Sequence, residues 1–337
     1  HHLLEHTSPE TLQADLAPLV LELAVAGIKD VDELRWLDAP PLSALEQGAQ
    51  LLTMLGALDQ SGAITHHGRA MAALPVHPRI AHMLIRSIAI GNGAIACDIA
   101  AILGERDFVR GVDGPADADI GIRLELLHAP AGRVALHGAQ VDGTQLRRIA
   151  AESMALRRQL GVANHSAGET ANAGVVLALA YPDRIGQARG GVMDGRFLLR
   201  NGRGAALTHP QGPSSAQYIV VAELDGDARS SRIFLGASLT QLEIDAQFAD
   251  QVEVEEILEW DDRARSVRAR MRTRLGAITL SESLVTDPGM KGAAQLMLNI
   301  VRREGIQTLP WSGAAKAVRE RVAFVRARHA DWPDMSD

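Results

Sequence analysis

The chain has 337 residues, which is long enough for two or three domains with separate hydrophobic cores. Hydrophobic residues make up 47% of it and aromatic residues only 3%, so we expect cores of Leu, Ala, Val and Ile and a mainly helical fold. The formal net charge of −7 excludes a uniformly basic surface, so any contact with nucleic acid must be local. Cys97 is the single cysteine, which excludes an internal disulfide, and no apolar run reaches roughly 18 residues, so we expect a cytoplasmic protein without a membrane span.

The first 74 residues predict helices and a hairpin in the order of a winged helix. The expected helices cover residues 9–26, 31–37, 44–55 and 66–74, and the expected hairpin covers residues 58–65. Pro18 lies inside the first helix, where it should kink or restart it, and Gly56 is expected to end the third helix in the left-handed conformation. The helix over residues 44–55 carries neither Arg nor Lys, so we interpret this module as a docking unit rather than a reader of DNA sequence.

Residues 75–183 have a helical pattern throughout and predict a small bundle. Its helices are expected near residues 79–90, 94–105, 119–128, 144–160 and 168–180, with loops at residues 111–119 and 128–143. Pro78 is expected in the first turn of its helix, because a proline is tolerated there. Four arginines on the fourth helix suggest either a solvated face or an approach to phosphates: Arg147, Arg148, Arg157 and Arg158.

The period of the apolar residues changes to two after residue 184, which predicts strands. Asp194-Gly195 indicates a hairpin between residues 191–193 and 196–199. Six to eight short strands follow without helices between them, so we expect one small closed barrel over residues 184–286, similar to an OB fold. Residues 287–337 become helical again, which gives a fold that is mainly α with a β-barrel.

One strand of this region is the best candidate for contact with nucleic acid. Its arginines alternate along the chain, so a strand would place them on one face about 6–7 Å apart, close to the phosphate repeat of a single strand: Arg268, Arg270, Arg272 and Arg274. Val267, Ala269 and Met271 would then face the barrel interior. A second, weaker patch lies on the first hairpin: Arg196, Arg200 and Arg203.

A structural role for the same arginines competes with phosphate binding. If the chain turns near residues 262–264, acidic residues of the preceding strand lie across from three of the arginines. The expected cross-strand pairs are Glu259 with Arg268, Glu255 with Arg272 and Glu253 with Arg274, while Arg270 lies across from the uncharged Ile257. Both alternatives stay open at this point.

Motifs for independent catalysis are missing. None of the three lysines is followed by Ser or Thr, so no GxxxxGK[ST] phosphate loop and no ATP site can form in this sequence. The histidines do not have metal-ligand spacing, and no HExxH motif or defensible Ser-His-Asp order occurs. We therefore expect no metal, no cofactor and no catalytic residues in this chain.

Several segments carry a resemblance to a known family. LLxxLGALDxxGxIT (residues 51–65) with GRxMAxLPVHPRIAxML (residues 68–84) resembles the junction of winged-helix and ratchet domains in DEAH-box ATP-dependent helicases, in detail the bacterial HrpB type. LRWLDAPP (residues 34–41), RLGAITLSE (residues 274–282) and LPWSGAAKAVRERVAFVR (residues 309–326) add to it, so the resemblance spans nearly the whole chain.

The resemblance implies a domain order and a set of partners. It implies a winged helix at residues 7–74, a helical ratchet at 75–183, an OB-like barrel at 184–286 and a truncated C-terminal helical region at 287–337. ATP and Mg²⁺ would belong to RecA-like motor domains outside this sequence, which would be partners along with single-stranded RNA or DNA. The alternative function is a protein-interaction scaffold that does not bind nucleic acid, and salt-dependent titration with single-stranded RNA would separate the two.

Overall fold

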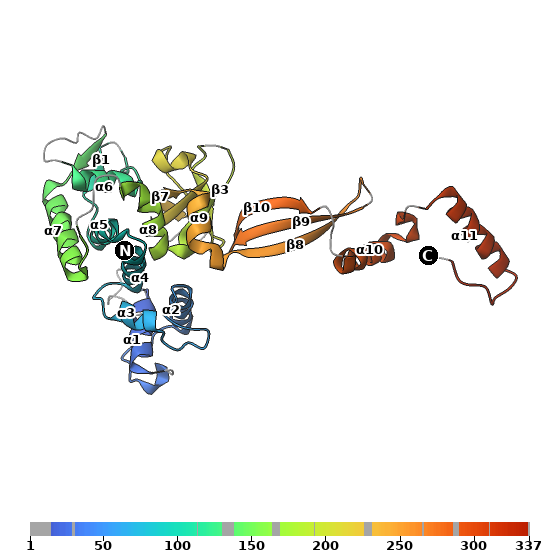
Figure 1. Cartoon of the computed structure of the whole chain (residues 1–337), viewed down its shortest axis with the longest axis horizontal. Coiled ribbons are helices and arrows are strands. Elements are labelled where there is room, and N and C mark those ends of the chain that lie inside the picture. The colour runs from blue at the N-terminus through green and yellow to red at the C-terminus, as the bar shows by residue number, and fades with distance from the viewer. Residues whose placement is uncertain are drawn as a thin grey trace, which may run out of the picture. The chain divides into compact units, whose positions relative to one another are not determined.

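The computed structural model describes most of the chain as a mixed helical and sheet structure (Figure 1). It describes residues 15–28, 31–112, 114–129, 138–163, 169–191, 193–225, 231–264, 266–285, 290–309 and 311–335. The chain divides into two compact units, His1–Ala249 and Asp250–Asp337. Each unit is described by itself.

The first unit begins with three helices, α1 (Ala17–Ala26), α2 (Leu42–Met54) and α3 (His66–Ala72). Pro18 lies in the first turn of α1 and therefore starts the helix rather than kinking it; the expected start near Pro9 lies outside the described residues. The expected hairpin is reduced to one bridge, between Leu58 and Ile64. Gly56 has a φ of +70°, the left-handed conformation expected after α2. The short helix expected at residues 31–37 is a single 3₁₀ turn, Val31–Glu33.

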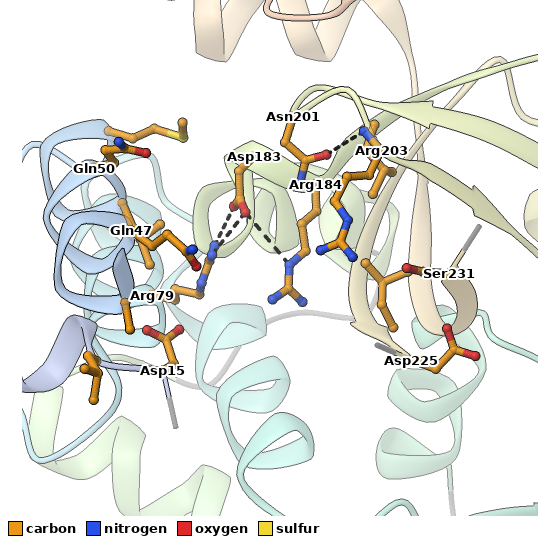
Figure 2. Close-up of a pocket in the computed structure, with 16 residues that line it drawn as sticks. Asp15, Gln47, Gln50, Arg79, Asp183, Arg184, Asn201, Arg203, Asp225 and Ser231 are labelled. Carbon is orange, nitrogen blue, oxygen red and sulfur yellow. Dashed lines mark hydrogen bonds and ion pairs between the residues drawn. The ribbon is translucent and has the colours of Figure 1, made fainter. Parts of the chain in front are cut away.

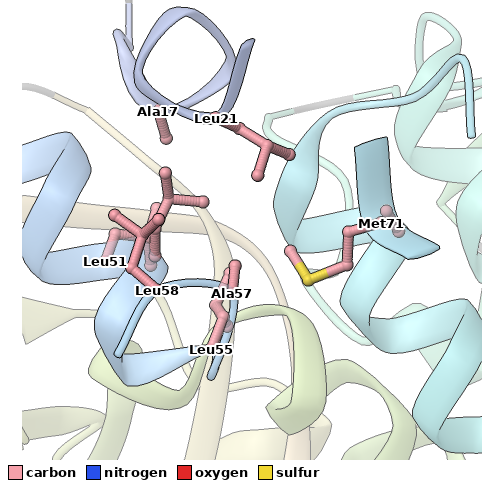
Figure 3. Close-up of a cluster of buried hydrophobic side chains, with 9 residues drawn as sticks. Ala17, Leu21, Leu51, Leu55, Ala57, Leu58 and Met71 are labelled. Carbon is pink, nitrogen blue, oxygen red and sulfur yellow. The ribbon is translucent and has the colours of Figure 1, made fainter. Parts of the chain in front are cut away.

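These three helices share one apolar core (Figure 3). Ala17 and Leu21 of α1 face Leu51 of α2, and Met71 of α3 belongs to the same cluster. The core forms because the apolar residues of each helix recur every three or four positions and are buried together.

The bundle that follows contains α4 (Pro78–Ala89), α5 (Gly93–Gly104), α6 (Ile120–His128), α7 (Gly143–Leu160) and α8 (Ala173–Ala180). Pro78 stands in the first turn of α4, as predicted. Both segments predicted as loops contribute to a short antiparallel pair instead, β1 (Val109–Gly111) with β2 (Ala139–Val141). No hairpin signal marks this pair, because its strands are far apart along the chain and α6 lies between them.

Two buried charged residues, Asp98 and Arg123, tie the elements of the bundle together. Asp98 of α5 is 1% exposed and accepts hydrogen bonds from Arg157 and Ser153 of α7, and its carboxylate lies 2.8 Å from Nε2 of His128 on α6. Arg123 is also 1% exposed and lies 2.7 Å from the carboxylate of Asp107. A buried charge needs such partners, because an unpaired one would destabilise the fold.

A closed five-stranded barrel completes the first unit. Its strands are β3 (Ile185–Ala188), β4 (Arg196–Leu199), β5 (Gly204–Ala206), β6 (Tyr218–Leu224) and β7 (Ser231–Leu239), in the spatial order β3-β4-β5-β7-β6. Only the pairing of β5 with β7 is parallel. Gly174 of α8 lies so close to the carbonyl of Ser238 that a side chain there would clash, so α8 packs directly against β7.

The first barrel hairpin differs from its prediction. β4 pairs with β3 and not with residues 191–193, and Val192 lies outside the described residues. Met193 has a φ of +75°, which is incompatible with a strand and places it in the connecting loop with Asp194-Gly195.

The predicted extent of the barrel is also wrong. The helix α9 (Gln241–Phe248) follows β7 and separates the barrel from the remaining strands. Thr240 accepts a hydrogen bond from the backbone of Glu243, whose side chain accepts one from Thr240 in return. This capping box was visible in the sequence as Thr-x-x-Glu and would have predicted the helix.

The second unit contains a three-stranded antiparallel sheet, β8 (Glu253–Asp261), β9 (Ser266–Leu275) and β10 (Ile278–Val285), with β9 in the centre. The helix α10 (Met290–Glu304) packs on one face, where a side chain at Gly292 would clash with Leu258. The helix α11 (Gly313–Arg326) follows and has no buried residue. Residues 184–286 therefore do not form one barrel.

Candidate nucleic-acid interface

The arginines predicted to bind nucleic acid lie on β9 in the expected register. Glu259, Glu255 and Glu253 of β8 stand opposite Arg268, Arg272 and Arg274, and Ile257 stands opposite Arg270. The predicted register is therefore confirmed. The four arginines share one face of the sheet, because alternate residues of a strand point to the same side.

Carboxylates surround this row of arginines. Arg268 lies 2.5 Å from Asp261, Arg272 lies 3.7 Å from Glu255, and Arg274 lies 3.5 Å from Glu255. Arg270 lies across from the uncharged Ile257, as predicted, but Glu282 of β10 is 2.7 Å away and Glu259 is 3.7 Å away. The sequence interpretation missed Glu282 because it considered only one neighbouring strand. The ion pair with Glu282 raises the pKa of Arg270 and lowers that of the carboxyl group.

The opposite face of this sheet does not line a barrel. Ala269 is 2% exposed and lies on the face that carries Leu258, against which α10 packs. We expected this face to line the interior of a barrel. That prediction was wrong, because the helix α10 covers the face instead. The ion-paired face contains the four arginines and at least four nearby carboxylates, so it has no excess of positive charge to attract phosphate.

The second predicted patch lies on the barrel. Arg196 belongs to β4, Arg200 follows β4 directly, and Arg203 precedes β5. Arg196 is exposed and lies 3.3 Å from Asp194. The structure adds Arg189, which is exposed and donates its backbone N–H to the carbonyl of Arg196. The sequence interpretation missed Arg189 because it did not recognise the preceding residues as β3.

Arg203 lines a cleft of about 700 Å³ within the first unit. Figure 2 shows Gln47 and Gln50 of α2 on one side, and Arg203, Ser231 and Asp225 of the barrel on the other. Arg79, Asp183 and Arg184 lie between them. Residues from α2, α4, the turn before β3 and the barrel, which are far apart in the sequence, therefore form this cleft.

Two arginines at the centre of the cleft are held by the same carboxylate. Arg79 binds Asp183 at 2.6 and 3.1 Å, and Nε of Arg184 lies 3.9 Å from Asp183. Both guanidinium groups lie beside the ring of Tyr181, at 5.2 and 4.9 Å from its centre. Burial, and then the nearby positive charge of Arg79, lower the pKa of Arg184. Arg184 also donates to the carbonyl of Ala222 at 2.6 Å, which fixes its direction.

The arginines of α7 divide between buried and surface roles. Arg157 binds the buried Asp98, and Arg148 lies 2.7 Å from Glu105. Arg147 donates to Thr144 at 3.2 Å, and Arg158 is exposed. The helix therefore does not present its four arginines as one face.

The described residues contain neither of two other kinds of site. No three or more His, Cys, Asp or Glu side chains gather there as a metal would require. None of the described helices combines the length and the apolar character of a membrane span.

Comparison with known proteins finds similarity to one family of helicases. A model of the winged-helix part of the helicase-associated domain HA2 matches residues 49–76, and a model of the connector region of the ATP-dependent RNA helicase HrpB matches residues 251–284. HrpB of Escherichia coli (strain K12) is 31% identical over 335 residues, which is 98% of this chain. Over nearly its whole length the chain resembles the C-terminal region of an HrpB-type DEAH helicase.

A solved structure and a second relative agree with this relationship. The crystal structure of the E. coli DExH-box NTPase HrpB superposes over 98% of this chain with a TM-score of 0.68 and 29% identity. The probable ATP-dependent RNA helicase DHR2 of Saccharomyces cerevisiae is 35% identical over 101 residues, which is 30% of this chain and 14% of that protein. The chain spans 38% of the length of E. coli HrpB.

The two family models fall on structurally distinct parts of this HrpB-type region. The HA2 match starts within α2 and includes α3, so it covers part of the core in Figure 3. The connector match covers almost the whole sheet of the second unit, including the four arginines of β9 and their acidic partners. The ion-paired sheet therefore coincides with the segment that the HrpB connector model describes.

Proposed function

We propose that this chain is an accessory region of an ATP-dependent helicase, which guides single-stranded RNA or DNA and docks the RecA-like domains of the same polypeptide. The similarity to HrpB over 98% of the chain carries this proposal. ATP and Mg²⁺ would bind to the RecA-like domains, because the present sequence contains no GxxxxGK[ST] loop.

Each part of the region has a role in this proposal. The module with α1, α2 and α3 is a winged helix that docks the RecA-like domains, and the bundle from α4 to α8 is the ratchet. The barrel is OB-like, because OB folds are small five-stranded Greek-key barrels that bind single strands. Its boundaries are those of β3 to β7, and the second unit supplies the connector and C-terminal helices.

Two groups of arginines are candidates for the phosphate contacts. The barrel group consists of Arg189, Arg196, Arg200 and Arg203, and the β9 group consists of Arg268, Arg270, Arg272 and Arg274. We assign the main contact to the barrel group, since every arginine of the β9 group faces a carboxylate at 2.5–3.7 Å and both Arg270 and Arg272 face two. In the barrel group, Arg196 pairs with a single exposed carboxylate, that of Asp194 at 3.3 Å. Arginine suits either role because its planar donors match phosphate and carboxylate alike.

Titration of the chain with fluorescent single-stranded RNA at several salt concentrations tests this function. We expect binding that weakens linearly on a logarithmic scale as salt increases, because each phosphate contact releases a counterion. We also expect no ATP hydrolysis by this chain alone. The absence of measurable RNA and DNA binding at low salt would contradict the guiding role.

A scaffold that binds another protein is the second candidate function. The net charge of −7 and the ion pairs on β9 favour it, since neither promotes phosphate binding. α11 also leaves Val318 and Phe324 more than half exposed. Under this alternative, the RNA titration gives no salt-dependent binding, and the chain instead retains RecA-like domains in a pull-down at both low and high salt.

A further inference from the structure

The cleft between α2 and the barrel has two walls of different chemistry (Figure 2). Gln47, Gln50 and Met54 line it from α2 and carry no charge. Their spacing of three and four residues places them on one face of the helix. A glutamine amide both donates and accepts hydrogen bonds, and such an amide can pair with two positions on an adenine edge.

The other wall and the floor of the cleft are lined by three arginines and three carboxylates. The lining arginines are Arg79, Arg184 and Arg203, and the lining carboxylates are Asp15, Asp183 and Asp225. Two of these carboxylates have additional partners outside the lining, since His77 lies 3.4 Å from Asp15 and Arg232 lies 3.6 Å from Asp225. With Arg232, which lies just outside the lining, this cluster holds four arginines and three carboxylates, and the resulting charge of +1 favours an anionic ligand.

The position of Arg184 is fixed before any ligand binds. Its guanidinium group lies beside Tyr181, donates to the carbonyl of Ala222 and shares Asp183 with Arg79. A cation held this way loses little side-chain entropy when it binds an anion. Such preorganisation distinguishes this arginine from an exposed and mobile surface residue.

A nucleotide matches both walls, because it combines a negative phosphate with a neutral base that forms hydrogen bonds. We propose that the cleft binds one nucleotide of a single strand, with its phosphate at Arg184 and Arg203 and its base at Gln47 and Gln50. The volume of about 700 Å³ lies within the range of small-ligand sites. This inference rests on the proposed function and specifies where one part of the strand is held. An acidic peptide would satisfy the arginines but would not require the uncharged amide wall.

Two substitutions separate the contributions of the two walls. The probe is fluorescent oligoadenylate of about 12 nucleotides, a length close to the site size of an OB fold, as RNA and as DNA. Arg203→Gln should reduce the slope of log K against log salt by about 0.7, the value of one phosphate contact on a single strand. Gln50→Leu should weaken binding at least about fivefold and leave the slope unchanged, because a contact to a base releases no counterion.

Arg69→Gln is the matched control, because Arg69 is an exposed arginine of α3 that does not line the cleft. It should change neither affinity nor slope. Thermal melting of all three variants checks that they remain folded. The RNA and DNA probes bind alike if only phosphate and base are recognised, and RNA binds more tightly if the 2′-hydroxyl also contributes.

The outcomes distinguish this inference from the function on which it rests. If the oligonucleotides bind but Arg203→Gln and Gln50→Leu behave like Arg69→Gln, the nucleotide site is wrong and the guiding role stands. If no oligonucleotide binds to the unaltered chain, both are wrong. If polyglutamate displaces oligoadenylate at equal charge concentration and Gln50→Leu has no effect, the cleft is instead a site for an acidic protein segment.

Discussion

The two units of this molecule use the same kinds of ion pair in different surroundings. In the first unit, Arg123 and Asp98 are each 1% exposed: Arg123 ties α6 to Asp107 in the segment before β1, and Asp98 joins α5 to Arg157 of α7. In the second unit, the side chain of Arg268 is 51% exposed, although it lies only 2.5 Å from Asp261. A short distance therefore does not indicate a strong contribution to stability, because water screens the exposed pair.

The helices of the two units differ in the same way. Every residue of α8 is buried between the bundle and the barrel, whereas α11 has no buried residue. The first unit should therefore respond strongly to changes in its interior. The second should tolerate changes on its surface and report them mainly through binding.

Met83→Asp should give the largest effect. Met83 is fully buried on α4, so the substitution places an unpaired carboxylate in the core. The cost should approach the total stability of a typical domain, about 5–15 kcal/mol. Ile88→Asp on the same helix is the control, because Ile88 is 39% exposed and an aspartate there can reach water. Similar melting temperatures for the two variants would contradict this difference in burial.

Asp98→Asn should give the next largest effect. It removes the negative charge that binds Arg157 while leaving that arginine only 12% exposed. Breaking a buried pair in this way typically costs about 3–5 kcal/mol. Ser153→Ala removes only the hydroxyl group next to Asp98 and should cost less. Urea denaturation monitored by circular dichroism measures both, and equal costs would show that the charge at Asp98 is not the main contribution.

A pair of histidines should make the first unit less stable in acid. Nε2 of His67 lies 2.8 Å from Nδ1 of His82, and burial lowers the pKa of His82 to about 3. Burial and Arg86 lower the pKa of His67 as well. In the unfolded chain His82 has its ordinary pKa of about 6.5, so below that pH the unfolded state binds a proton that the folded state excludes.

The stabilisation from neutral His82 is thus complete above about pH 6.5 and decreases as the pH falls toward 3. Near pH 5 the loss should be about 2 kcal/mol. His82→Gln should reduce this pH dependence, and His209→Gln, at an exposed position, should not. Measurement of unfolding free energy between about pH 5 and 7 checks both, and an equal dependence in the two variants would exclude His82 as the cause.

Local patterns in the sequence predicted individual helices and strands better than the way in which these elements pack and pair with one another. Pro78 at the start of α4, Gly56 after α2 and the pairing of β8 with β9 followed from propensities and spacing that act within a few residues. The barrel ends at β7 because the short helix α9 separates it from the next strands. The only sequence signal for this helix was the capping box of Thr240 and Glu243. The β1–β2 pair joins segments about 30 residues apart, for which a single sequence contains no local signal.

The candidate site was predictable only in part for the same reason. The alternation of arginines on β9 and their register with β8 could be read from the sequence. Glu282 could not be assigned to Arg270, because its position depends on the pairing of β10. The cleft brings Arg79 of α4 together with Arg184 and Arg203, which lie more than 100 residues later in the chain. No pattern in the sequence predicts that these three arginines lie close together.

Substitutions in the two groups of arginines should have the smallest effects. They test directly whether the barrel of the first unit or the sheet of the second unit contacts RNA. Arg196→Gln on the barrel should reduce the salt slope of RNA binding by about 0.7, as expected for one lost phosphate contact. Arg270→Gln on β9 should leave the slope unchanged, because Glu282 and Glu259 already occupy this arginine. The melting temperature should also change little, since exposed ion pairs contribute little to stability. If Arg270→Gln lowers the slope and Arg196→Gln does not, the ion pairs open to bind RNA, and the nucleic-acid contact belongs to the connector sheet rather than the barrel.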